Sequence, residues 1–158
     1  MKRIFAAALV LFSSFSFAAS FDMKSGDELA GDRCAPGDVI YYGITKKGTK
    51  DVIICQDGQK VTYAFGNLMK NWSGKDLVLD VNASEVLDRV VDNAQESSEI
   101  FIVRNASNAY AIVHRVDLKT GTETNVLEVH TRDGKKQLAS IELDNDFIVN
   151  HIRDNFVK

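Results

Sequence analysis

The sequence predicts a mostly β protein: an antiparallel sandwich or flattened barrel of about eight strands with a C-terminal helix. Two observations support this class. Short runs rich in Val, Ile, Phe and Tyr follow one another closely, and several alternate between apolar and polar residues. Turn signals separate the runs, among them Asp57-Gly58 and Asp133-Gly134, and Asp-Gly is one of the strongest indications of a hairpin.

The first half of the chain contains four of the expected strands. In the third of them, Val61, Tyr63 and Phe65 share one face because successive side chains of a strand point to opposite sides, so these three are expected to face the core. Trp72 lies in the loop before the fourth strand. The four predicted strands are residues 39–45, 51–55, 60–65 and 76–81.

The second half supplies four more predicted strands, at residues 99–104, 109–117, 124–131 and 135–143. Between the two halves, residues 84–91 fit either a helical turn capped by Ser84 or an irregular crossover, and periodicity does not decide between them. Residues 144–157 change to a helical spacing of apolar side chains and predict the terminal helix. The side chains in this helical pattern are Phe147, Ile148, His151, Ile152 and Phe156.

The N-terminus has the pattern of an export signal. Lys2 and Arg3 precede an apolar run at residues 4–12, and Ser16-Phe17-Ala18 offers small residues at the two positions that a signal peptidase reads. Residues 1–18 are therefore predicted to be a signal peptide, and residues 19–158 a single domain in the periplasm. Because the apolar run is too short to span a bilayer and no Cys follows the cleavage point, no membrane anchor is expected.

The two cysteines, Cys34 and Cys55, both lie in the part of the chain predicted to be exported. In an oxidising compartment such a pair is expected to form a disulfide. The bond would close a loop of roughly 20 residues. It would stabilise the fold by about 3 kcal/mol because it lowers the conformational entropy of the unfolded chain.

The charge balance excludes some partners and favours others. The formal net charge of −3 falls to about −5 when Lys2 and Arg3 leave with the signal peptide. An acidic surface disfavours nucleic acid and anionic lipid, so neither is expected as a partner. It favours a cationic protein through long-range electrostatic attraction.

The residues that could carry catalysis do not form a recognisable pattern. His114, His130 and His151 are not spaced as metal ligands, although the first two lie on neighbouring predicted strands. The carboxylates are scattered over strands and turns as solubility alone would place them, and no nucleophile elbow or phosphate-binding loop occurs. The sequence thus predicts no enzyme, no metal and no cofactor. The scattered carboxylates include Glu123, Glu128, Asp133, Glu142, Asp144 and Asp146.

The turn at residues 105–110 is the expected binding element. It connects two long strands and carries hydroxyl groups on Ser107 and Tyr110, which are neutral and can enter an acidic cleft without burying an unpaired charge. The same residues also suit purely local roles, since Ser satisfies turn amides and Tyr packs well on a strand.

The chain resembles a family of small exported bacterial lysozyme inhibitors, of the chicken-type and invertebrate-type groups, in size, export signal, strand count and one motif. In that family a loop with a Ser-Gly-x-Tyr motif fills the active-site cleft of the enzyme, and Ser107-Asn108-Ala109-Tyr110 is similar to it. Asn108 departs from the motif, which has Gly there, but Asn tolerates positive φ better than most residues. The resemblance implies that Ser107, Asn108 and Tyr110 contact the target, with the two hydroxyls on its catalytic carboxylates.

The function that the resemblance implies is inhibition of a cationic peptidoglycan hydrolase such as lysozyme, and a homodimer is the assembly it suggests. Three other functions stay open. One is an immunity protein against a wall-degrading toxin from competing bacteria. Another is a non-enzymatic envelope protein with a structural role or a small-molecule ligand. The third, an envelope hydrolase, is the weaker hypothesis and predicts a pocket with convergent acids.

Overall fold

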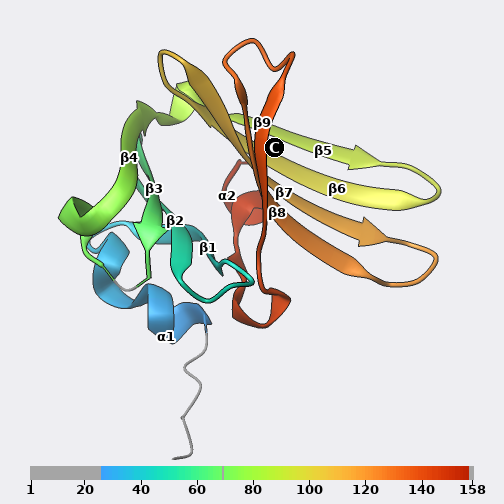
Figure 1. Cartoon of the computed structure of the whole chain (residues 1–158), viewed down its shortest axis with the longest axis horizontal. Helices are drawn as coiled ribbons and strands as arrows, with labels where there is room; N and C mark the ends of the chain where they lie inside the picture. Colours follow the sequence, from blue (N-terminus) through green and yellow to red (C-terminus); the bar gives the residue numbers. More distant parts are fainter. Residues whose placement is uncertain (1–25, 69, 157–158) are drawn as a thin grey trace, which may run out of the picture.

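The computed structural model describes residues 26–68 and 70–156, and these residues form two antiparallel sheets of five strands each. The first sheet has the order β10-β1-β2-β3-β4, and the second has the order β5-β6-β7-β8-β9 (Figure 1). The strands are β1 Asp38–Ile44, β2 Lys50–Asp57, β3 Lys60–Asn67, β4 Lys75–Asn82, β5 Leu87–Asp92, β6 Glu96–Arg104, β7 Asn108–Asp117, β8 Glu123–Thr131, β9 Gln137–Glu142 and β10 Val149–Asn150.

The predicted fold class is confirmed, since the sheets consist of consecutive strands joined by short turns. The turns expected at the two Asp-Gly pairs occur between β2 and β3 and between β8 and β9. Gly58 and Gly134 adopt φ angles of 56° and 72° there, a backbone conformation that glycine reaches without steric cost. In Figure 1 the first sheet lies on the left, and the hairpins of the second sheet extend to the right.

The main hydrophobic core lies between the two sheets. Val61 and Tyr63 are fully buried in it and Phe65 packs against it, which confirms the face predicted for this strand. The second sheet contributes side chains from its three central strands, and the ring of Tyr110 lies 5.5 Å from that of Tyr63. The buried members from the second sheet are Phe101, Val103, Tyr110, Ile112 and Leu127.

A second apolar cluster covers the other face of the first sheet. It is formed by helix α1 (Gly26–Ala30) and the 3-10 turn η1 (Gly31–Cys34), which pack on β1, β2 and β3. Ile53 and Ala64 are fully buried under this layer. Because both faces of β1 and β2 are covered, the sequences of these two strands are almost continuously apolar rather than alternating.

Residues 84–91, for which the sequence left two interpretations, divide into two elements. Ala83–Glu85 form the 3-10 turn η3, in which the Asn82 side chain accepts a hydrogen bond from the backbone N–H of Ser84 at 3.0 Å. The chain then enters β5, which pairs with β6 along its length. The segment is therefore a short helical turn followed by the edge strand of the second sheet.

The C-terminal helix exists but is short. Helix α2 spans Ile152–Phe156, whereas the sequence predicted a helix over residues 144–157, so the prediction for residues 144–151 was wrong. These residues form the 3-10 turn η4 (Asn145–Phe147) and strand β10. The apolar pattern resembles a helix because alternate side chains pack on both faces of the first sheet: Phe147 and Val149 in the outer cluster, Ile148 in the main core.

Candidate functional site

The predicted binding turn lies at the end of the β6–β7 hairpin and is organised by Asn105. The Asn105 carboxamide oxygen accepts hydrogen bonds from the backbone N–H groups of Ser107 at 2.9 Å and Asn108 at 2.8 Å. The Asn105 backbone N–H donates to the carbonyl oxygen of Asn108 at 3.0 Å. Such a side-chain turn fixes the backbone through bonds to neighbouring residues, so much of the order of the turn is local.

The three predicted contact residues differ in their exposure to solvent. Ser107 is exposed, Asn108 is half-buried, and Tyr110 keeps only 9% of its surface because its ring belongs to the main core. The Tyr110 hydroxyl accepts hydrogen bonds from the carboxamides of Asn105 and Asn108, both at 3.3 Å. The predicted pair of surface hydroxyls is therefore corrected: Ser107 is presented to solvent, and Tyr110 supports the turn from below.

A second turn lies beside the first. The backbone N–H of Arg132, in the β8–β9 hairpin, donates to the carbonyl oxygen of Ser107 at 3.1 Å. This hairpin turn exposes Arg132, Lys135 and Lys136. Its one acid is Asp133, whose pKa lies below the usual range mainly because the hydroxyl of Thr131 donates to it. We refer to residues 105–108 and 131–136 together as the tip, a locally cationic end of the second sheet.

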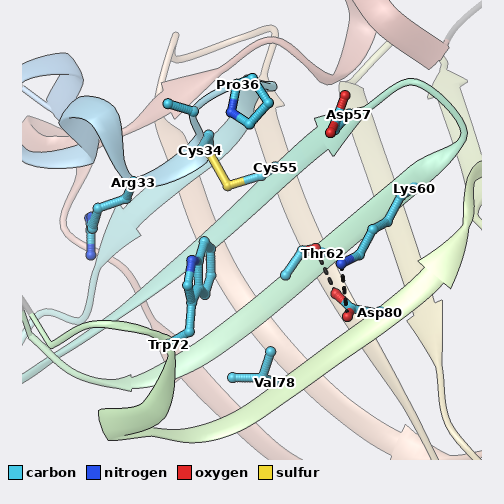
Figure 2. A pocket seen from close by; sticks show the side chains of 11 residues that line it. Arg33, Cys34, Pro36, Cys55, Asp57, Lys60, Thr62, Trp72, Val78 and Asp80 are labelled. Carbon is cyan, nitrogen blue, oxygen red and sulfur yellow. Dashed lines mark hydrogen bonds and ion pairs between the residues drawn. A yellow bond between two sulfur atoms is a disulfide. The ribbon is translucent and has the colours of Figure 1, made fainter.

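The outer face of the first sheet carries a groove that surrounds Trp72. Figure 2 shows Trp72 beside the Cys34–Cys55 disulfide, with Val78 and Thr62 close to it. One hollow of about 360 Å³ lies on this side and reaches Lys60 and Asp80. Another of about 420 Å³ is lined by Trp72, Lys70 and Asn71. Both hollows border on Arg33, Ala35 and Trp72, and we call them together the Trp72 groove.

Asp80 provides the fixed charge of the first hollow. Its carboxylate accepts a hydrogen bond from the Thr62 hydroxyl at 2.7 Å and lies 3.0 Å from the ammonium of Lys60, as the dashed lines in Figure 2 indicate. The Thr62 hydrogen bond, followed by Lys60, holds the pKa of Asp80 below its ordinary value. The hollow therefore contains a charged acceptor and a charged donor at neutral pH.

A buried ionic cluster fixes the N-terminal wall of the groove. Asp51 is fully buried, and its carboxylate binds the guanidinium of Arg33 at 2.8 Å and the ammonium of Lys75. Arg33 also donates to the carbonyl oxygens of Leu29 and Ala30, at 2.9 Å and 3.1 Å. The side chain of Lys75 is 1% exposed, so both cations depend on one carboxylate that water does not reach.

Tyr42 lies beneath this cluster, with the Arg33 guanidinium 5.0 Å from its ring centroid. Its hydroxyl is buried and has no hydrogen-bond partner among the described residues. Burial, and then the nearby charge of Asp51, raise the pKa of Tyr42 to about 12. The residue therefore stays neutral and acts as a flat apolar support for Arg33.

The predicted disulfide is confirmed, since Cys34 and Cys55 are bonded and their Cα atoms are 5.3 Å apart. It ties η1 to β2 and forms part of the groove wall. Disulfides persist in oxidising compartments, so the bond fits an exported protein. The predicted signal peptide, residues 1–18, lies outside the described residues. Within the described ranges, no helix is long and apolar enough to cross a membrane.

The histidines on the neighbouring strands do not meet. His114 lies 3.1 Å from the Asn125 side chain, which also accepts from the Tyr41 hydroxyl at 3.3 Å, whereas His130 pairs with Glu128 at 2.9 Å. In residues 26–68 and 70–156, no three His, Cys, Asp or Glu side chains gather as metal ligands would.

The sequence interpretation did not identify the Trp72 groove. Its one local signal was the single tryptophan of the chain, placed among polar residues in a loop. Lys70 and Asn71 directly precede it in the chain, whereas the other lining residues come from η1 and the two residues after it and from β2, β3 and β4, and only the fold brings these to Trp72.

In comparison with known proteins, the chain matches no family model, and no curated protein or solved structure matches it.

Proposed function

We propose that this protein is a periplasmic inhibitor that inserts the tip into the active-site cleft of a peptidoglycan-cleaving hydrolase such as lysozyme. The observation that carries the proposal is the hydrogen bonding of Asn105, which holds Ser107 exposed at the end of a stiff hairpin. A turn that is already ordered loses little conformational entropy on binding, so more of the contact energy appears as affinity.

The charge distribution favours such a target both at long range, before the two proteins meet, and at short range, inside the cleft. The net charge of −3 attracts a cationic protein over long distances and accelerates encounter. At short range, glycoside hydrolases cleave with a pair of carboxylates in the cleft. Arg132, Lys135 and Lys136 are exposed in the turn that is hydrogen-bonded to Ser107, and their cations are complementary to those acids. Inhibition is then steric occlusion with charge-assisted hydrogen bonds, without turnover.

The roles implied by the resemblance change in one respect. Ser107 remains the contact to the catalytic carboxylates, whereas Tyr110 acts indirectly, through its hydrogen bonds with Asn105 and Asn108. Substitution of Tyr110 is therefore expected to alter inhibition through the shape of the turn.

The proposal is tested by inhibition assays against chicken-type and invertebrate-type muramidases and a bacterial wall-degrading hydrolase. Two alanines provide a matched pair, because Ala106 and Ala94 are both exposed and lie in turns at opposite ends of β6. Each turn is organised by an Asn side chain, Asn105 in one and Asn93 in the other. Ala106→Arg adds bulk to the tip, and Ala94→Arg adds the same bulk and charge at the far end.

The chain is expected to inhibit at least one of these enzymes, and Ala106→Arg to raise the inhibition constant about tenfold or more. Ser107→Ala removes one central hydrogen bond and is expected to raise it by about tenfold. Ala94→Arg is expected to leave it unchanged. Inhibition that is equally strong in both arginine variants, or absent with every hydrolase, contradicts the proposal.

A further inference from the structure

The Trp72 groove is a built binding surface at a place that the proposed function does not use. Trp72 is half-buried, so its indole is fixed by its neighbours yet reached by solvent. Among the described residues, the indole N–H donates no hydrogen bond to the protein. The ring borders hollows of about 360 and 420 Å³, so a ligand can contact it from either one.

The charges of the first hollow disfavour an anionic ligand. The hollow is lined by the cations of Arg33 and Lys60 and by the carboxylates of Asp57 and Asp80. Arg33 is already paired with the buried Asp51, and Lys60 with Asp80. An anionic ligand would have to displace one of these ion pairs, whereas a neutral ligand need not.

The polar groups favour a ligand with many hydroxyls. The oxygens of Asp80 accept hydrogen bonds, and Thr62 and Lys60 donate beside them on the wall of the first hollow. Asn71 offers a carboxamide in the second hollow, which can both donate and accept. Ligand sites of this kind combine an apolar contact surface with a few placed polar groups.

We propose that the Trp72 groove binds a short neutral glycan. The apolar C–H face of one saccharide ring stacks on the indole of Trp72, and adjacent hydroxyls of that ring donate to Asp80 and accept from Lys60. The second hollow takes the next ring of the chain, against Lys70 and Asn71. The groove and the tip involve different residues, so glycan binding and hydrolase inhibition succeed or fail separately.

The chain contains one tryptophan, so intrinsic fluorescence reports directly on this site. The probes are chitotriose, cellotriose and maltotriose, titrated against the full protein while tryptophan emission and calorimetric heat are followed. At least one of them is expected to shift the emission of Trp72 and to bind with a dissociation constant below about 10 mM.

Variants then locate the binding. Trp72→Ala and Asp80→Asn are each expected to weaken affinity about tenfold or more, measured by calorimetry, with Trp72→Phe losing less because it keeps an aromatic face. Asp76→Asn is the matched control, because Asp76 is also an exposed β4 carboxylate paired with a lysine but lies outside both hollows. Circular dichroism checks that each variant is folded.

Two outcomes overturn the proposal. One is that none of the three glycans binds below about 10 mM. The other is binding that Trp72→Ala and Asp80→Asn leave unchanged, or that Asp76→Asn weakens as much as Asp80→Asn does. Muramidase inhibition is measured on the same preparations, so failure of one proposal is separated from failure of the other.

Discussion

The tip and the Trp72 groove are assembled in opposite ways. The β6–β7 turn of the tip is ordered by one side chain, Asn105, which bonds backbone groups only two and three residues away. The groove combines η1, β2, β3 and the loop before β4, which the disulfide and the Asp51 cluster hold together. Order in the tip is therefore local, whereas order in the groove depends on a few contacts between distant segments.

This difference predicts how each region responds to substitution. Loss of one long-range contact removes a wall of the groove and a large part of the stability, because that contact joins whole segments. Loss of one local contact at the tip affects a single turn.

Asp51→Asn is expected to have the largest effect. It leaves the cations of Arg33 and Lys75 without their buried counter-charge, which costs about 3–5 kcal/mol of unfolding free energy. Asp76→Asn breaks the exposed pair with Lys50 and is expected to cost about 0–1 kcal/mol. Urea unfolding followed by tryptophan emission measures both. Similar losses in the two variants would show that the buried cluster does not hold the groove.

Replacement of both Cys34 and Cys55 by Ala is expected to cost about 2–4 kcal/mol, because the unfolded chain loses a loop closed across 21 residues. The melting temperature of the native protein should fall on reduction, and that of the double variant should not respond to reductant. Inhibition through the tip is expected to persist in the folded double variant. An unchanged melting temperature on full reduction would contradict a stabilising role for the bond.

Asn105→Ala is expected to cost about 1 kcal/mol, since two backbone N–H groups lose an acceptor but can turn to water. Asn93 accepts from the N–H groups of Gln95 and Glu96 in the same manner, so Asn93→Ala is the control turn. Because Asn105 also donates to the Tyr110 hydroxyl at 3.3 Å, its loss should cost slightly more than that of Asn93, and only Asn105→Ala should weaken inhibition. A loss of several kcal/mol at Asn105 would mean that the tip is not locally ordered.

The adjacent tyrosines of β1 give the smallest expected effect. Tyr42→Phe removes a buried hydroxyl that has no hydrogen-bond partner among the described residues, so the unfolding free energy should stay the same or rise slightly. Tyr41→Phe removes a hydrogen bond to Asn125 and should cost about 1 kcal/mol. Thermal unfolding compares the two. A larger loss of unfolding free energy in Tyr42→Phe than in Tyr41→Phe would contradict this expectation, because it would mean that the Tyr42 hydroxyl makes a stabilising hydrogen bond.

The elements that the sequence predicted correctly are those determined by local residue order. Alternation placed Val61 and Tyr63 in the core, and Asp57-Gly58 located a hairpin. The pairing of Cys34 with Cys55 followed from their number and expected compartment. The prediction of a helix over residues 144–151 was wrong because a segment that packs on both faces of a sheet is as rich in apolar residues as a helix. Phe147 and Ile148 illustrate this, since they pack on opposite faces of the first sheet.

The two candidate sites differ in the same way. The turn at residues 105–108 was predicted because its residues are consecutive, but the burial of Tyr110 depends on Tyr63, 47 positions earlier in the chain, so both hydroxyls were expected at the surface. The groove was missed because Trp72, Asp80 and Arg33 have no common spacing. Only the pairing of β3 with β4 and the packing of η1 bring them together.

The division of binding between the tip and the groove is tested most directly by one inhibition assay, with the native protein, Ala106→Arg and Trp72→Ala measured against the same muramidase. We predict that the native protein and Trp72→Ala inhibit with equal constants, while Ala106→Arg is weaker by about tenfold or more. No inhibition by the native protein, or a loss in Trp72→Ala as large as that in Ala106→Arg, would contradict the assignment of hydrolase binding to the tip.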